Sequence, residues 1–137
     1  MNIFFTGAIS GGRAHQPNYA RITKALDAYG TVHSRHVDDG DLSQYGETRL
    51  SASDIRTREI AALERSDVVV AEVSTPSLGV GYLIAHAVLL NKKVVALLAD
   101  EDTLKLSAII KGDANVAVYA YKTDADVERV LAEVFAN

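Results

Sequence analysis

The sequence predicts an α/β fold, a doubly wound parallel sheet of five strands in the order 2-1-3-4-5 with helices on both faces. Runs rich in Val, Ile, Leu and aromatic residues alternate with runs of helical periodicity along all 137 residues. Such alternation implies crossover connections, which cover both faces of a parallel sheet. Five strands favour the doubly wound order, and the length suits one domain over residues 1–137.

Each predicted element follows from a local pattern. Five apolar runs have the composition of buried strands: Asn2–Thr6, Thr31–Val37, Asp67–Val73, Lys93–Ala99 and Asn115–Tyr121. The helices predicted between and after them are Pro17–Tyr29, Ser53–Arg65, Val80–Asn91, Asp124–Phe135 and a shorter one within Glu101–Lys111. Pro17 suits a first helical position and Gly30 a C-terminal stop.

Composition limits the class of partner. A net charge of -4 gives no general attraction to nucleic acid, so the expected ligand is a small molecule rather than a polymer. No apolar run reaches the roughly 20 residues of a membrane span, and Met1–Phe5 lacks the basic flank of a signal peptide. Without cysteine, thiolate metal sites and disulfides are excluded, and a cytoplasmic location is expected.

The predicted strand order also places a binding crevice. Strands one and three would be neighbours whose following connections leave toward opposite faces, which opens a crevice at their carboxyl ends. The connections that face it, Gly7–Gln16 and Ser74–Gly81, are the two most glycine-rich in the chain. The long polar stretch Asp38–Ala52 is the candidate third wall.

The segment Pro76-Ser77-Leu78-Gly79-Val80-Gly81-Tyr82-Leu83 carries the strongest functional signal. Two glycines two residues apart allow a close approach of the backbone to a ligand, and a helix N-terminus beside them offers N–H groups to an anion. The first connection nearly matches a phosphate-binding P-loop, but Arg13 and Ala14 replace its lysine and its hydroxyl. A nucleoside triphosphatase is therefore rejected, and a plain strand-to-helix turn is an equal alternative there.

Two glutamates are candidates for chemistry. Glu72 ends a buried strand, where an unpaired carboxylate is costly, so we expect it to bond to a neighbouring backbone group or to face the crevice. Glu59 lies in a helix among arginines, and its spacing alone predicts a surface ion pair. The four histidines lack ligand spacing, so no metal site is predicted.

Four segments together resemble one family. Ile3–Arg13, Ser66–Val73, Pro76–Tyr82 and Leu106–Gly112 are similar, in order, to segments of the 2'-deoxynucleoside 5'-phosphate N-hydrolases, which are relatives of the nucleoside 2-deoxyribosyltransferases. The resemblance implies a flavodoxin-like homodimer. It also implies cleavage of the base–sugar bond of deoxynucleoside monophosphates by a glutamate nucleophile, without metal or cofactor.

The resemblance further implies which residues hold the nucleotide. Its 5'-phosphate would lie between the first connection and the turn after Pro76, with one serine supplied by the other subunit. The implied nucleotide-binding residues are Gly7, Ala8, Ile9, Ser10, Ser77, Gly79, Gly81 and Ser107 of the partner subunit. An oxocarbenium-like centre at C1' needs a nearby carboxylate, and a monophosphate needs N–H groups and hydroxyls.

The chain departs from the family pattern around that pocket. Leu83 stands in place of the catalytic glutamate, and a leucine can neither attack C1' nor stabilise positive charge there. Phe4 replaces the tyrosine that positions this glutamate, while Ala8 and Ser10 replace a serine and an arginine of the first connection. Glu59 stands in place of a sugar-contacting aspartate.

Two functions therefore stay open. As an enzyme, the protein would be an N-glycosidase in which another carboxylate replaces the lost one, with Glu59 as the first candidate and Glu72 as the second. As a binding protein, it would hold a nucleoside monophosphate or a sugar phosphate without cleaving it. The apolar helix predicted over Val80–Asn91 indicates a homodimer in which this helix packs against its counterpart, unless its own domain covers it.

Overall fold

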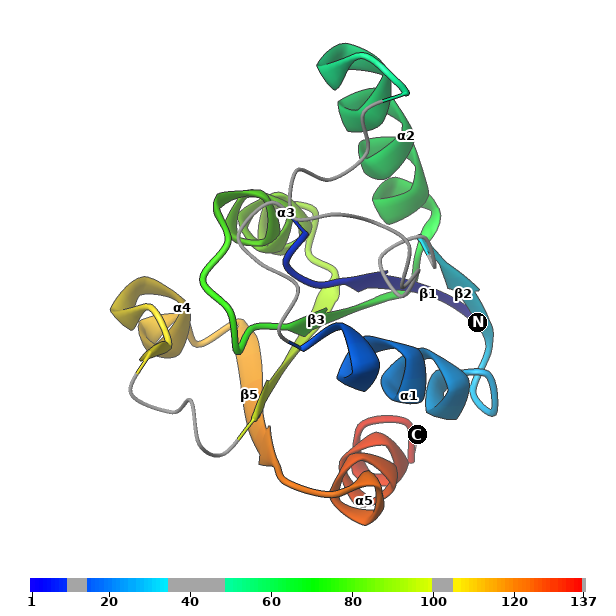
Figure 1. Cartoon of the computed structure of the whole chain (residues 1–137), viewed down its shortest axis with the longest axis vertical. Coiled ribbons are helices and arrows are strands. Elements are labelled where there is room, and N and C mark those ends of the chain that lie inside the picture. Colours follow the sequence, from blue (N-terminus) through cyan, green and yellow to red (C-terminus); the bar gives the residue numbers. More distant parts are fainter. Residues whose placement is uncertain (10–14, 35–48, 100–104, 137) are drawn as a thin grey trace.

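The computed structural model describes residues 1–9, 15–34, 49–99 and 105–136 (Figure 1). Its elements are β1 (Asn2–Thr6), α1 (Gln16–Leu26), β2 (Thr31–His33), α2 (Ala52–Arg65), β3 (Val68–Glu72), α3 (Leu78–Leu89), β4 (Lys93–Ala99), α4 (Ala108–Gly112), β5 (Val116–Tyr121) and α5 (Asp124–Val134). All neighbouring strands pair in parallel in the order β2-β1-β3-β4-β5. The predicted fold class and strand order are confirmed.

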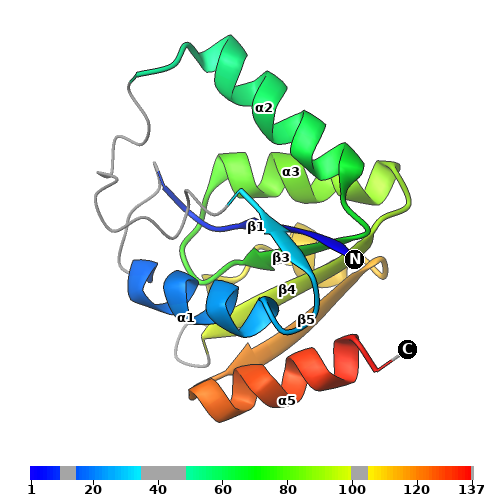
Figure 2. The same ribbon diagram turned by 90° about the vertical axis from the view of Figure 1, so that its right-hand side faces the viewer.

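Helices cover both faces of the sheet. Figure 2 shows α2 and α3 on one face and α1 and α5 on the other. Each face has its own apolar core, and alternate residues of β3 contribute to the two cores: Val68 and Val70 face α1 and α5, while Val69 and Ala71 face α2 and α3. Both faces of the strand are buried, and this explains its unbroken apolar run.

The strand register brings the polar ends of several strands to one edge of the sheet. Thr6 at the end of β1 pairs with Ala71, Glu72 at the end of β3 pairs with Leu97, and Ala99 at the end of β4 pairs with Tyr121. The connections that follow these strands start at this carboxyl edge. It is the edge where a doubly wound sheet binds its ligands.

Several predicted boundaries are wrong by a few residues, each for a local reason. Helix α1 ends at Leu26 rather than Tyr29, because the N–H groups of Ala28 and Tyr29 bond three residues back and the chain tightens into turns. The strand predicted over Thr31–Val37 extends only to His33 in the described part of the chain, since Ser34 adopts a left-handed φ of 65°. Residues 35–48, which include most of the candidate third wall, lie outside the described ranges.

The two helices nearest the predicted site also differ from expectation. Helix α3 starts at Leu78, earlier than Val80, because Ser77 caps it with its side chain. The short helix predicted within Glu101–Lys111 starts only at Ala108, where Ser107 caps it in the same way. None of the described helices has the length and hydropathy to cross a membrane.

Candidate functional site

The first turn of α3 presents donors at the carboxyl edge of the sheet. The Ser77 hydroxyl accepts the Val80 N–H at 3.3 Å, and the Gly81 N–H bonds to the Ser77 carbonyl at 3.1 Å. The Gly79 N–H has no hydrogen-bond partner within the part of the chain that the structure describes. The Ser77 hydroxyl can still donate its own hydrogen, so Gly79 and Ser77 offer two adjacent donors to an anion.

The two glycines of this turn have open space above them. A Cβ built on Gly79 would meet only the Ser77 hydroxyl, at 3.9 Å, and one on Gly81 would meet no described atom within 4 Å. Both residues are helical, and glycine in a helix costs about 1 kcal/mol relative to alanine. Neither close packing nor backbone conformation in the described structure requires glycine here. The approach of another molecule is a sufficient reason.

A cavity of about 540 Å³ adjoins this turn, between the amino half of α3 and α4. Its volume lies within the range of small-molecule pockets, about 300–1,000 Å³. Ser77, Gly81 and Ser107 of the same chain line this cavity, whereas the family resemblance implied a Ser107 supplied by the partner subunit. The remaining wall is mostly apolar: Val73, Thr75, Pro76, Leu78, Val80, Ile84, Ala85, Lys105, Leu106, Ile109, Ile110 and Asp113.

The described part of the first connection faces the core instead of that cavity. A Cβ on Gly7 would lie 2.8 Å from Cζ of Tyr19, which is itself fully buried, so packing explains this glycine. Ala8 is also fully buried, and Ile9 packs against the core on the α1 and α5 face. Ser10 lies outside the described residues. The plain-turn alternative therefore accounts for Gly7.

Leu83 and Phe4 belong to the same apolar cluster on the α2 and α3 face. Phe4 is fully buried in β1, and Leu83 is a partly buried member packed against the cluster that contains Phe4. Leu83 is not among the residues that line the cavity beside α4. The structure thus brings the two substituted positions to one face of the sheet without a carboxylate at either.

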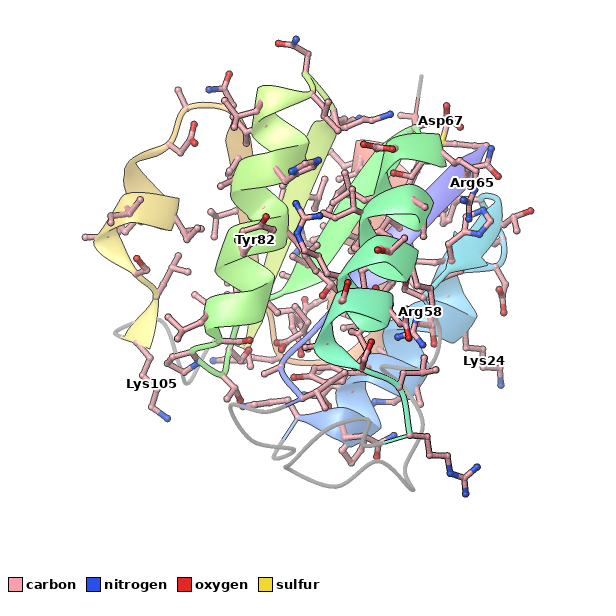
Figure 3. All side chains as sticks on the ribbon, turned by 90° about the horizontal axis from the view of Figure 1, so that it is seen from above. Lys24, Arg58, Arg65, Asp67, Tyr82 and Lys105 are labelled. Atoms are coloured by element: carbon pink, nitrogen blue, oxygen red, sulfur yellow. The ribbon has the colours of Figure 1, made fainter. Side chains whose placement is uncertain are left out.

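Glu59 already has partners for both carboxylate oxygens. Its Oε1 accepts from Nε of Arg58 and pairs with Nη2 of the same side chain, both at 2.9 Å. Its Oε2 accepts from the Ser34 hydroxyl at 2.9 Å, and only 12% of the Glu59 side chain is exposed. Figure 3 shows α2, which carries Arg58, running beside α3. The predicted ion pair is present, although Glu59 is mostly buried rather than at the surface, and the separate hydrogen bond from Ser34 ties α2 to the end of β2.

Glu72 is fully buried on the face covered by α1 and α5, not in the cavity. Its Oε1 accepts from the Ser74 hydroxyl and, at 3.0 Å, from the Tyr121 hydroxyl, while its Oε2 accepts the Ser74 N–H at 3.3 Å. Burial raises the pKa of the Glu72 carboxyl above its usual value of 4.5. Burial and the neighbouring Glu72 also raise the pKa of the Tyr121 hydroxyl.

The bond from the Ser74 N–H agrees with the expected backbone partner of Glu72, but sequence reasoning missed the two hydroxyl partners of Glu72 and the partner of Tyr82. A serine two residues after a strand-ending glutamate is a recognisable local pattern, but the register that brings Tyr121 to the same carboxylate comes from the folded sheet. Arg56 on α2 donates from Nη2 to the Tyr82 hydroxyl on α3 at 2.9 Å. In the described ranges, no group of three or more potential metal-ligating side chains is close enough to hold an ion.

Comparison with known proteins agrees with this architecture. The family model for nucleoside 2-deoxyribosyltransferase matches residues 3–130. A 5-hydroxymethyl-dUMP N-hydrolase of Danio rerio is 41% identical over 138 residues, which cover 98% of this chain and 96% of that protein. The Homo sapiens enzyme of the same name is 37% identical over 137 residues, 97% of this chain and 78% of that protein.

A solved structure, the CMP N-glycosidase BcmB of Clostridium botulinum, superposes with a TM-score of 0.65 at 18% identity, over 96% of this chain and 98% of that one. This likeness shows a shared fold. The family match and the identities to the N-hydrolases extend over nearly the whole sequence. The chain therefore belongs to the nucleoside 2-deoxyribosyltransferase family.

Proposed function

We propose that this protein binds a nucleoside 5'-monophosphate, with the phosphate at the amino end of α3, and cleaves its base–sugar bond slowly or not at all. The observation that carries the proposal is the open, donor-bearing turn at Ser77, Gly79 and Gly81. Relatives covering almost the whole chain are N-hydrolases of a nucleoside monophosphate, 5-hydroxymethyl-dUMP. The proposal assigns the same class of ligand to this chain.

We expect slow cleavage because none of the three candidate catalytic positions has a carboxylate free to reach the sugar. Leu83 has no carboxylate, Glu59 has both oxygens occupied by Arg58 and Ser34, and Glu72 is buried on the other face of the sheet. Attack on C1' needs a carboxylate free to approach the sugar. Among the described residues, none of the three candidate positions supplies one.

A second function, N-glycosidase activity through Glu59, has one observation in its favour. Glu59 is mostly buried and bonds to Ser34, the residue directly after β2, so it lies near the carboxyl edge of the sheet. To act on the sugar, the Glu59 carboxylate would have to break its bonds to Arg58 or to Ser34. Loss of base release in Glu59→Gln, with Glu64→Gln on the same helix as the matched control, would identify it as the acting carboxylate.

We also propose that the protein forms a homodimer through the α3 and α4 side. Leu78, Leu89 and Ile109 are 97%, 81% and 84% exposed, which is unusual for large apolar side chains. In this dimer the partner contributes its own Ser107 to the nucleotide site, as the family resemblance implies. Light scattering should give twice the chain mass, and Ile109→Asp should reduce it to one chain. A single-chain mass for the wild type at micromolar concentration would contradict the dimer.

The expected location of the protein is cytoplasmic.

Base release is the experiment that tests the proposed function. Wild-type protein incubated with each deoxynucleoside monophosphate should bind ligand in calorimetry but release almost no free base by chromatography. Leu83→Glu with Phe4→Tyr should restore measurable release, since loss of a covalent nucleophile costs several orders of magnitude in rate. Ala132→Glu adds a carboxylate to the exposed side of α5, away from the proposed site and dimer surface, and should restore nothing. Brisk release by the wild type would overturn the proposal.

A further inference from the structure

The connection from β3 to α3 is held at its start by a buried hydroxyl and carboxylate. Ser74 is only 1% exposed, and it uses both its N–H and its hydroxyl to bond to Glu72. The same hydroxyl accepts the N–H of Ala99 at 2.8 Å, where β4 ends. Ser74 is therefore fixed to β3 and β4 at once, through one oxygen that donates and accepts.

Little chain separates this fixed point from the proposed phosphate turn. Only Thr75 and Pro76 lie between Ser74 and Ser77, and the proline ring restricts its own φ. One residue before Ser74, the Val73 N–H bonds to the Leu97 carbonyl at 2.9 Å. A displacement of Ser74 would thus move the cap of α3 and the donor at Gly79 with it.

A buried carboxylate is an expensive way to secure a core. A hydrophobic side chain of similar volume often stabilises a protein as well or better, and retained buried charges can instead specify one geometry. Two of the three described donors to Glu72 come from Ser74 itself, so these two bonds fix the start of the connection, while the Tyr121 hydroxyl stabilises the buried group from β5. Glu72 does not line the cavity beside α3, and among the described residues Ser74 links it to the turn of α3.

We propose that Glu72 and Ser74 are positioning residues that set the phosphate-binding turn of α3. The inference rests on the proposed function and adds to it the buried pair that determines where the donors of that turn point. Neither side chain contacts the ligand. Their effect is expected on recognition of the phosphate group and not on recognition of the nucleoside.

The test compares deoxyuridine 5'-monophosphate with deoxyuridine as calorimetric probes, at a temperature where every variant is folded by circular dichroism. Ser74→Ala should weaken monophosphate binding about tenfold, because hydrogen bonds to an anion lose strength steeply with misalignment, and leave deoxyuridine binding within about twofold. Ser74→Thr keeps the hydroxyl and should restore wild-type affinity. If Ser74→Ala does not fold, Ser74→Cys replaces it, since a thiol of similar size is a weaker donor.

Tyr121→Phe is the matched control. It removes a hydroxyl that donates to the same Glu72 oxygen, but from β5 rather than from the connection. It should lower stability and leave the ratio of the two affinities unchanged. Equal loss of monophosphate binding in both variants, or no loss in Ser74→Ala, would overturn the inference while the phosphate site stands. Equal affinity of the wild type for the two probes would overturn the phosphate site itself, and the inference with it.

Discussion

The two glycine-rich connections at the carboxyl edge of the sheet serve different purposes. After β1, Gly7 is buried, and a side chain there would strike the ring of Tyr19 at 2.8 Å. After β3, a Cβ on Gly79 or Gly81 would meet open space, and Gly81 lines a cavity of about 540 Å³. The first glycine satisfies the core of its own chain, whereas the other two leave room for a second molecule.

The difference shows that a glycine pattern marks close approach without saying what approaches. In both connections glycine allows a neighbour nearer than a Cβ would permit. At Gly7 that neighbour is an aromatic ring already in the fold, held edge-to-face by Phe5 with ring centroids 6.0 Å apart. At Gly79 and Gly81 no described neighbour fills the space. Substitution at the two places should therefore have opposite effects on stability.

The largest effect is expected at Gly7. Gly7→Ala should lower the free energy of unfolding by about 3 kcal/mol, the upper part of the range for overpacking, because the added methyl group would force the fully buried Tyr19 ring to shift. Urea unfolding measures the change. Gly112→Ala, at an exposed glycine with open space at the end of α4, is the matched control and should not lower the free energy of unfolding. Unchanged stability in Gly7→Ala would show that packing does not require this glycine, and a ligand contact would then be the explanation for it.

Removal of the cap of α3 should affect both stability and binding. Ser77→Ala and Thr123→Ala each delete the side-chain cap of one helix, α3 or α5, so each should cost about 1 kcal/mol. Only Ser77→Ala should also weaken binding of a nucleoside monophosphate, by about tenfold, since a hydrogen bond to a charged group contributes roughly 1.5–3 kcal/mol. Equal binding by the two variants would remove Ser77 from the phosphate site.

Substitution of the open glycines should separate stability from function. Gly79→Ala and Gly81→Ala should each raise the free energy of unfolding by roughly 0.5–1 kcal/mol, through better helix propensity and a less flexible unfolded chain. Monophosphate affinity should fall in the same variants, because the added methyl group occupies space left for the ligand. More stable variants with undiminished affinity would show that the space serves another purpose.

The smallest expected effect is a pH dependence of the free energy of unfolding, which arises from the buried Glu72. Because the pKa of Glu72 is raised in the fold, its protonated form is favoured there, so its contribution to stability is full below pH 4.5 and is lost as pH rises through the folded pKa. Glu72→Gln stays neutral at every pH. Urea unfolding at several pH values should show the free energy of unfolding of Glu72→Gln increasing relative to that of the wild type as the pH rises from 4.5. Parallel curves would contradict the raised pKa.

Local patterns in the sequence were sufficient for the fold and for part of the site. Alternating apolar periods predicted all five strands and their order, because period and crossover geometry leave few alternatives. Glycine spacing predicted the turn at the start of α3, although the cap at Ser77 moved the helix start. An ion pair of Glu59 was also predicted from the arginines around it in the helix, and the structure shows that Arg58 is its partner.

Only the tertiary structure decided which way the ambiguous side chains face and what they meet. From the sequence, Glu72 was expected either to bond to a neighbouring group or to face the crevice. The register of β3, β4 and β5 brings it within hydrogen-bond distance of the Tyr121 hydroxyl. The same holds for Gly7, whose neighbour Tyr19 comes from a helix packed across it. Sequence patterns encode what one segment does by itself, whereas the role of a glycine or a carboxylate depends on atoms that other segments bring to it.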